Sequence, residues 1–396
     1  MVLDTEFPPD SRVENEAVSL IQAGHEVYLF SLNYGTHPGY EEINGIHVHR
    51  YPSNQIEYKS SALAYTLPFY HNRMRRKIAD FIRKLSPDVL HVHDLTVAKA
   101  ALDAAAGAGI PAVLDLHENR PVIMQEYVHV KKFPGKYLIN PSTWTAWQNR
   151  LAGKADRLVL VTDEACDDLA GESGVSRDKM ISVPNTVTLS IYDNYRVDMS
   201  VWSEYENNFV LLYMGDTGLR RGTDTLIQAM PAILQEIPEA RLILVGSNTE
   251  DIQLHALVEE LGLKSEVVFE GWQDVSRFPS YVAAADLCFS PLKRNRHHDT
   301  TFANKIFQYM AGGKPLVVSD CPPQAHVVES SRCGMVHPAD DPVALAGVVK
   351  KLYLDKEECG KMGDNARKAV EQHWNWKETS KSLIQMYESF ADPVPE

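Results

Sequence analysis

The chain has 396 residues, 44% hydrophobic and 23% charged, which is the balance of an ordinary soluble globular protein of about two to three domains. Asp and Glu number 53 against 39 Lys and Arg, and the net charge of −14 argues against nucleic acid as a partner, because proteins that bind phosphate backbones are basic. No run approaches the roughly 18–20 apolar residues of a membrane span, and the acidic start lacks the pattern of a signal peptide. These features predict a cytoplasmic protein.

Short apolar runs alternate with helical stretches along almost the whole chain, which favours an α/β fold with helices on both faces of parallel sheets. In the first half the predicted helices include Glu14–Ala23 and Asn72–Leu85, and the predicted strands are Val27–Leu32, Val89–His93, Ala112–Leu116, Leu158–Thr162 and Ile181–Val183. In the second half the predicted strands are Phe209–Met214, Arg241–Val245, Val267–Phe269, Leu287–Ser290 and Pro315–Ser319. The opening residues Met1–Leu3 are shorter than an ordinary strand, which is the pattern of a first strand that has lost a few residues.

A segment without helical or strand periodicity, Pro184–Asn208, separates the two halves and is typical of a domain crossing. We therefore predict one domain at residues 1–190 and a second at residues 191–372. The last predicted helix, Asn375–Phe390, carries apolar side chains at helical spacing that require a partner surface. Residues 373–396 are accordingly expected to return to the first domain.

The predicted strand Phe209–Met214 runs into a glycine-bearing loop, G-D-T-G-L-R-R-G at Gly215–Gly222, and then into a helix. Glycines allow a tight turn whose amides face an anion, the helix N-terminus adds partial positive charge, and Arg220 and Arg221 supply charged donors. The loop predicts a phosphate site. The alternative is a common βα turn with two solvated arginines.

A second polar cluster lies at Asp299–Pro315. Thr300, Asn304 and Gln308 are spaced by four, so a helix through them places all three on one polar face. The threonine-rich start predicts another helix N-terminus that faces an anion. The alternative is a capped surface helix.

The ordered motifs resemble those of the family-4 retaining glycosyltransferases with the GT-B fold. In the second half they are G-x5-R-G-x-D-x-L-I-x-A at Gly215–Ala229, F-E-G-W at Phe269–Trp272, A-A-A-D at Ala283–Asp286 and N-K-I-F-Q-Y-M-A-G-G-K-P at Asn304–Pro315. In the first half they are F-P-P-D-S-R-V-E-N-E-A at Phe7–Ala17, A-G-H-E-V at Ala23–Val27, D-L-H-E-N at Asp115–Asn119 and V-P-N at Val183–Asn185.

The resemblance implies two Rossmann-like doubly wound domains that face a cleft, with the C-terminal helix crossing back to the N-terminal domain. It implies that residues 1–190 bind the acceptor and residues 191–372 the sugar nucleotide. The implied reaction moves a hexose, with retention and without an obligatory metal or cofactor, from a nucleotide-diphosphate sugar to a glycan or lipid-linked acceptor in cell-surface polysaccharide biosynthesis.

The resemblance also assigns site residues. Arg221 matches the family's basic residue that stabilises the departing diphosphate, and His117 matches a histidine that lies against the donor sugar, expected here as a neutral imidazole. The other predicted donor-binding residues are Gly215, Asp216, Thr217, Gly218, Arg220, Gly246, Trp272, Asp299, Thr300, Thr301, Asn304, Lys305 and Gln308. The predicted acceptor-side residues are Pro9, Arg12, Asp94 and Glu118, with His91 and His93 expected to line or support the cleft.

Three positions depart from the family pattern. Asp216 stands where the family has an arginine, and Thr300 and Gln308 stand where it has two glutamates. These departures motivate an alternative, a non-catalytic or partner-dependent nucleotide-sugar-binding protein of the same fold. A sugar-nucleotide epimerase is a weaker alternative, because the N-K-I-F-Q-Y-M-A segment counts against it.

No metal site is predicted. His297, His298 and Asp299 are adjacent rather than spaced for ligation. The five cysteines are scattered without C-x-x-C spacing, which predicts buried free thiols.

The segment Tyr70–Leu85 is a basic amphipathic helix by pattern, and Lys131, Lys132 and Lys136 add positive charge to the same half. Such a helix can rest on an anionic membrane, here the inner face. The alternative, which we favour, is an apolar stripe that faces the core below a solvated basic face.

Overall fold

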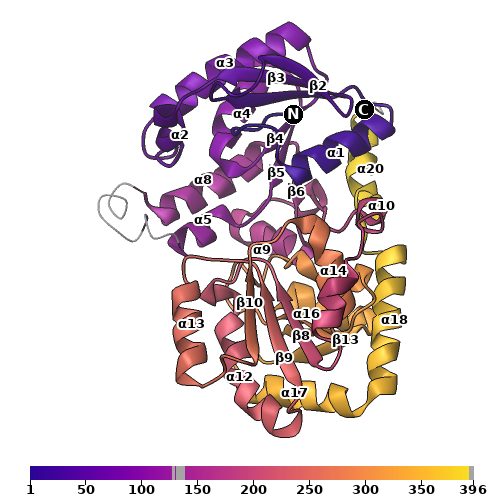
Figure 1. Cartoon of the computed structure of the whole chain (residues 1–396). Coiled ribbons are helices and arrows are strands. Elements are labelled where there is room, and N and C mark those ends of the chain that lie inside the picture. Colours follow the sequence, from indigo (N-terminus) through magenta and orange to yellow (C-terminus); the bar gives the residue numbers. More distant parts are fainter. Residues whose placement is uncertain (127–129, 131–138, 392–396) are drawn as a thin grey trace. The chain divides into compact units, whose positions relative to one another are not determined.

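The computed structural model describes residues 1–126, 130 and 139–391. It divides into two compact units, the first formed by Met1–Pro184 and the segment from Ser380 onward, the second by Asn185–Thr379 (Figure 1). The division after Pro184 falls at the start of the predicted crossing segment, a few residues before the predicted boundary at 190/191. The predicted last helix, Asn375–Phe390, is wrong in its bounds, since two helices stand there, α19 (Trp376–Thr379) and α20 (Lys381–Ala391). Of the segment predicted to return, 373–396, the part up to Thr379 belongs to the second unit and α20 belongs to the first.

The sheet of the first unit is mostly parallel. Its strands are β1 (Tyr28–Asn33), β2 (Tyr40–Ile43), β3 (Ile46–Pro52), β4 (Leu90–His93), β5 (Ala112–Leu116), β6 (Arg157–Leu160) and β7 (Met180–Ser182). They pair in the orders β1-β3-β2 and β4-β5-β6-β7, and β2 alone runs antiparallel to its neighbour. Val2 bridges Phe30 of β1 and Val92 of β4, so the short opening segment joins the two sets of strands.

Strands β2 and β3 were not predicted. In β3 buried positions alternate with half-buried ones, and the latter carry His47, His49 and Tyr51. This alternation is typical of a strand with one face toward solvent. The strands were predicted from continuous apolar runs, and β3 has no such run.

The helices of the first unit cover its sheet (Figure 1). They are α1 (Ser11–Gln22), α2 (Gln55–Ser61), α3 (Phe69–Leu85), α4 (Leu95–Ala108), α5 (Arg120–Ile123), α8 (Pro141–Lys154), α9 (Asp163–Ser173) and α20, with 3-10 turns η1 (Met124–Glu126) and η2 (Arg177–Lys179). Met74, Ile78 and Phe81 of α3 are buried in the core with the strands. The apolar stripe of α3 therefore faces the core, as favoured; Lys131, Lys132 and Lys136 lie outside the described residues.

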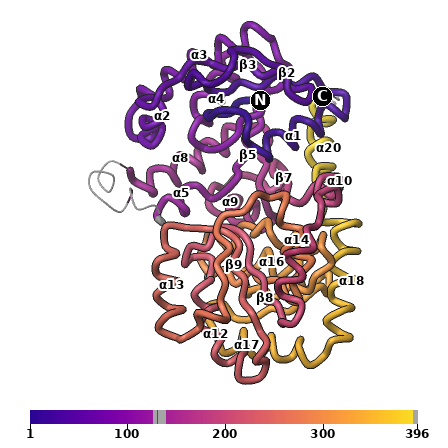
Figure 2. Tube along the Cα trace, in the orientation of Figure 1, coloured from indigo at the N-terminus to yellow at the C-terminus, as the bar shows by residue number. Residues whose placement is uncertain are grey.

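The chain of the second unit, which Figure 2 traces, forms a fully parallel sheet. Its strands are β8 (Phe209–Met214), β9 (Ala240–Val245), β10 (Val267–Gly271), β11 (Leu287–Ser290), β12 (Leu316–Ser319) and β13 (Gly334–His337). The strands lie side by side in the order β10-β9-β8-β11-β12-β13. The order along the chain therefore runs backward from β10 to β8 and forward from β11 to β13, and it reverses between β8 and β11. Open α/β sheets bind ligands beyond the carboxyl ends of the strands at such a reversal.

Alternate residues of β8 enter two separate hydrophobic clusters, Leu211 and Tyr213 in one and Leu212 and Met214 in the other. Both faces of the sheet are thus buried under helices, which explains why β8 and β11 were predicted to the residue from continuous apolar runs. The helices are α10 (Leu189–Tyr192), α11 (Met199–Glu204), α12 (Thr223–Glu236), α13 (Asp251–Glu260), α14 (Phe278–Ala284), α15 (Lys305–Ala311), α16 (Pro322–Ser331), α17 (Pro342–Leu354), α18 (Lys356–Gln372) and α19 (Trp376–Thr379), with 3-10 turns η3 (Leu219–Arg221) and η4 (Val275–Arg277).

All five cysteines are free thiols; Cys359 is half-buried and the other four are buried. No helix in the described part of the chain is both long enough and apolar enough to cross a bilayer.

Gly246, directly after β9, has a φ of +142°, and a Cβ there would lie 1.9 Å from the carbonyl oxygen of Gly215. We expect Gly246→Ala to lower the free energy of unfolding by roughly 2–4 kcal/mol, because strain and overpacking add. Gly347→Ala is the control, since that helical glycine meets open space and alanine there is expected to stabilise by about 0.5–1 kcal/mol. Urea unfolding followed by tryptophan fluorescence measures both; equal effects of the two substitutions would contradict the prediction.

Candidate functional site

Two loops meet where the strand order of the second sheet reverses. One, residues 215–222, follows β8, and the other, residues 291–304, follows β11. The backbone N–H of Lys293 donates to the carbonyl oxygen of Arg220 at 3.3 Å. Gly222 has a φ of +75°, and a Cβ there would lie 1.7 Å from the carbonyl oxygen of Pro291, so only glycine allows this approach. The fold thus brings the two motifs predicted for the second half to one place.

The first loop combines Asp216 with two arginines. Oδ2 of Asp216 lies 3.1 Å from Nη2 of Arg220 and 3.4 Å from Nε of Arg221. Burial by itself raises the pKa of Asp216, but hydrogen bonds from Gly218 and Asn248 and the two guanidinium groups outweigh burial and lower it. Asp216 is therefore an anion held against the two predicted phosphate ligands.

The loop amides have internal partners. The N–H of Gly218 donates to Oδ1 of Asp216 at 3.1 Å, and the N–H of Leu219 donates to Oε2 of Glu250 at 2.9 Å. Thr217 is fully buried and its hydroxyl donates to Asp251. The prediction that these amides face outward as an anion cradle is wrong for this state of the loop, because carboxylates of the same unit accept from them.

Lys305, the first residue of α15, adds a third basic side chain. Its Nζ is buried 3.5 Å from the ring centre of Tyr213 and has no hydrogen-bond partner among the residues that the structure describes. A Cβ at Gly215 would lie 3.5 Å from this nitrogen. Burial, followed by the charge of Arg221, lowers the pKa of Lys305 well below its usual value.

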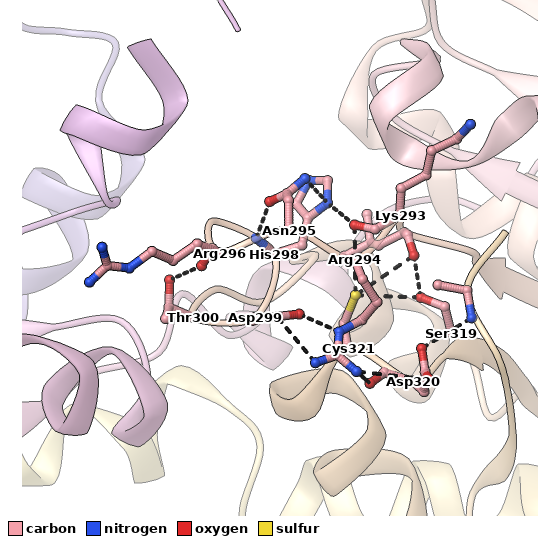
Figure 3. Close-up of polar contacts among 12 residues, drawn as sticks. Lys293, Arg294, Asn295, Arg296, His298, Asp299, Thr300, Ser319, Asp320 and Cys321 are labelled. Atoms are coloured by element: carbon pink, nitrogen blue, oxygen red, sulfur yellow. Dashed lines mark hydrogen bonds and ion pairs between the residues drawn. The ribbon is translucent and has the colours of Figure 1, made fainter. Parts of the chain in front are cut away.

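The second loop is held by its own side chains (Figure 3). Arg294 donates to both carboxylate oxygens of Asp299, at 2.6 and 3.1 Å, and lies 3.8 Å from Asp320. The ring Nδ1 of His298 lies 2.7 Å from the carbonyl oxygen of Lys293. Asp299, one of the predicted donor-binding residues, is therefore engaged by Arg294.

The predicted helix through Thr300, Asn304 and Gln308 is wrong. Helix α15 begins at Lys305, with Asn304 at its N-cap, so Thr300 and Thr301 precede it. The Thr300 hydroxyl donates to the carbonyl oxygens of Arg296 and His297, at 2.9 and 3.2 Å, and the Thr301 hydroxyl donates to that of His297 at 2.9 Å. Threonine bonds local backbone readily, which competes with helix formation.

The remaining predicted donor-binding residues lie in the same unit, on or next to α15 or directly after β9 and β10. Asn304 is exposed and Gln308 is half-buried on α15. Gly246 follows β9 and donates its N–H to the carbonyl oxygen of Gly271 at 2.8 Å. Trp272 follows the edge strand β10 and is 73% exposed. His297 and His298, which sequence reasoning excluded as metal ligands, are buried beside this site, and burial is the main cause that lowers their pKa values to about 3 and about 4.

In the first unit, His117 follows β5 and lies against carboxylates. Its Nε2 is 2.9 Å from Oδ2 of Asp115, and its Nδ1 is 3.7 Å from Oδ2 of Asp94. Burial favours the neutral ring, but these two carboxylates outweigh burial and raise the pKa of His117 to about 9. The expectation of a neutral imidazole is therefore wrong: His117 is a cation at neutral pH.

Arg12 does not fit its predicted place on the acceptor side. Its guanidinium is buried, bonds both oxygens of Asp115 at 2.8 and 3.0 Å, and donates to the carbonyl oxygen of Val183 at 2.8 Å. Of the other acceptor-side candidates, Pro9 is exposed, Asp94 is partly exposed beside His117, and Glu118 pairs with Arg120 at 3.0 Å.

Glu16, His91, His93 and Asp115 are buried together, with one possible ligand atom of each within 4.8 Å of the others. These are residue types that bind transition metals. The cation between the two carboxylates is, however, Arg12, which lies 3.0 Å from Glu16 and 2.8 Å from Asp115. Sequence reasoning missed this network, since its members come from three separate elements, α1, β4 and β5.

Two family models match this chain, one for each half of it. A model of the glycosyl transferases group 1 matches residues 195–369, and a model of Glycosyltransferase Family 4 matches residues 11–191. An uncharacterized glycosyltransferase of Methanocaldococcus jannaschii is 22% identical over 381 residues, which cover 94% of this chain and 91% of that protein.

Two solved structures resemble the whole chain. Sucrose-phosphate synthase from Thermosynechococcus elongatus has a TM-score of 0.76 at 18% identity and covers 98% of this chain and 96% of its own. Anabaena HepE, in complex with UDP-glucose, has a TM-score of 0.70 at 17% identity and covers 98% of both chains. At these identities the likeness shows the fold alone, two Rossmann-like domains of the GT-B class.

The charge of His117 gives the first unit a pH dependence. An unfolded histidine has a pKa of about 6.5, below the value of about 9 in the fold. The ion pairs of His117 therefore stabilise the fold fully below pH ~6.5, and this contribution is lost as the pH rises through about 9. We expect the free energy of unfolding of His117→Gln to fall short of the wild type by more at pH 6 than at pH 10, measured in urea. An equal shortfall at both pH values, or a His117 resonance that titrates near 6.5 by NMR, would contradict the assignment.

Proposed function

This chain belongs to the glycosyltransferases of group 1 and family 4, and we propose that it moves a hexose from a nucleotide-diphosphate sugar to a glycan or lipid-linked acceptor. The proposal includes retention at the anomeric carbon and no obligatory metal, as the family resemblance implies. It assigns the donor to the second unit and the acceptor to the first. The reaction is proposed to take place in the cytoplasm. The exposed arginines of α3 are proposed as the surface that meets a lipid-linked acceptor at the inner face of the membrane.

The observation that carries the proposal is the convergence of three basic side chains at the reversal of the strand order in the second sheet. Arg220 and Arg221 come from the loop after β8, and Lys305 of α15 places its buried Nζ near Gly215. Basic side chains beyond the carboxyl ends of parallel strands, at the point where the strand order reverses, are suited to hold a diphosphate. A solved structure of similar fold contains UDP-glucose, which makes uridine diphosphate sugars the first donors to test.

The difficult step of the proposed reaction is breaking the bond between the anomeric carbon and the diphosphate. Negative charge develops on the leaving diphosphate, so fixed cations there lower the barrier. We assign this role to Arg221, with Arg220 and Lys305 binding the same group. His117 uses its Nε2 on Asp115, while Nδ1 lies 3.7 Å from Asp94; through Nδ1 it is proposed to hold a sugar hydroxyl or stabilise developing charge.

One observation favours a second candidate, binding of a nucleotide sugar without transfer by this chain alone. Neither Thr300 nor Gln308 offers the carboxylate of the family pattern, and the Thr300 hydroxyl already bonds backbone carbonyls. Incubation with a panel of uridine, guanosine and adenosine diphosphate sugars, with and without candidate acceptors, separates the two. Release of nucleotide supports transfer or hydrolysis; tight binding without release from any donor supports the second candidate.

We expect Arg221→Ala to lower turnover about 10²–10³-fold, because the loss of one charged donor from a dry site costs about 3–4 kcal/mol in the transition state. Arg177→Ala is the control: Arg177 also pairs with carboxylates, Asp163 and Asp167, but lies in the first unit. Initial rates of nucleotide release at saturating donor measure both variants. Equal losses would refute the assignment of Arg221 to the diphosphate.

A further inference from the structure

Asp216 occupies the donor groups that the proposed diphosphate needs. Its carboxylate accepts from the N–H of Gly218, from Nδ2 of Asn248, and from the guanidinium groups of Arg220 and Arg221. A backbone amide at a glycine turn, a side-chain amide and two guanidinium groups form the donor set that binds phosphate oxygens. Resting on the proposed function, we propose that Asp216 is an internal competitor that the diphosphate of the donor displaces, and that it sets a reduced affinity for the nucleotide.

The carboxylate is held in this position from two sides. Asn248, which donates to Oδ1 of Asp216, is itself fixed, since its backbone N–H donates to Asp251 at 2.9 Å. Asp251 in turn accepts from the hydroxyl of the buried Thr217 in the same loop. Asp216 is therefore not a freely rotating surface side chain, and it faces the guanidinium groups without help from a ligand.

Cationic groups nevertheless outnumber this carboxylate. Nη1 of Arg220 and Nζ of Lys305 are both buried and have no hydrogen-bond partner among the described residues. Burying polar donors without hydrogen-bond partners is costly, so these two nitrogens point to a ligand with acceptor oxygens that binds beside them. Asp216 satisfies Nη2 of Arg220 and Nε of Arg221 but leaves these two groups for the ligand.

An incoming diphosphate would meet Asp216 as a like charge. It gains the unpartnered nitrogens of Arg220 and Lys305, and it must also take Arg220 and Arg221 from their carboxylate partner or share them with it. Like charges placed together at a binding surface oppose binding by amounts that correspond to tenfold or more in affinity. The consequence is weaker binding of the donor and faster release of the nucleoside diphosphate product than the cations alone would give.

The test compares the wild type with Asp216→Asn and Asp216→Glu by isothermal titration calorimetry. The probes are UDP, GDP, ADP and inorganic pyrophosphate at fixed ionic strength. Asparagine keeps an oxygen for the N–H of Gly218 but removes the negative charge, so we expect about tenfold tighter binding of the nucleotide that the wild type binds. Glutamate keeps the charge, so Asp216→Glu is expected to stay much closer to the wild type. A lower KM for the donor sugar in Asp216→Asn, with slower nucleotide release, is the expected kinetic counterpart.

Asp193→Asn is the matched control, because it removes a carboxylate from an arginine pair elsewhere in the second unit, Asp193 with Arg367 at 2.9 Å. Equal or weaker nucleotide binding by Asp216→Asn, when the wild type binds, would overturn this inference and leave the proposed function standing. Weaker binding would instead make Asp216 an orienting partner of the arginines. If neither the wild type nor Asp216→Asn binds UDP, GDP or ADP, the proposed function is overturned together with this inference.

Discussion

The interaction that governs the proposed diphosphate site of the second unit is the ion pairing of Asp216 with Arg220 and Arg221. Buried or half-buried cations are costly unless an anion compensates them. In this loop one carboxylate compensates two guanidinium groups, while Nζ of Lys305 is buried against Tyr213 without a hydrogen bond from the described residues. The remaining positive charge lies at the reversal of a doubly wound sheet, which is where such folds bind ligands.

In the first unit, too, a buried charge is compensated by groups of opposite charge, here two cations around one carboxylate. Asp115 is fully buried, and Arg12 and His117 both donate to it. Burial raises the pKa of Asp115, but the two cations outweigh burial and hold it well below its usual range. Together with Asp94, which directly precedes α4, the Asp115 carboxylate keeps His117 protonated, whereas the charge of Arg12 opposes that protonation.

The sequence predicted much of this structure for identifiable reasons. Strands β5, β8 and β11 are buried on both faces and were placed to the residue, because continuous apolar runs suffice to find them. Strand β3 was missed because one of its faces is polar, and β2 because none of its residues is buried. The loop at Gly215–Gly222 was found from its glycines and arginines. Its internal carboxylate partner Glu250 was not, because that contact depends on the packing of neighbouring loops, which local pattern does not contain. The late start of α15 was missed because the hydroxyls of Thr300 and Thr301 bond backbone instead.

A crystal structure of the protein soaked with a nucleoside diphosphate tests the central claim most directly. We expect diphosphate oxygens within hydrogen-bond distance of Arg220, Arg221 and Lys305, with the carboxylate of Asp216 turned away from the guanidinium groups. A nucleotide bound elsewhere in the chain, with the Asp216 ion pairs intact, would contradict it.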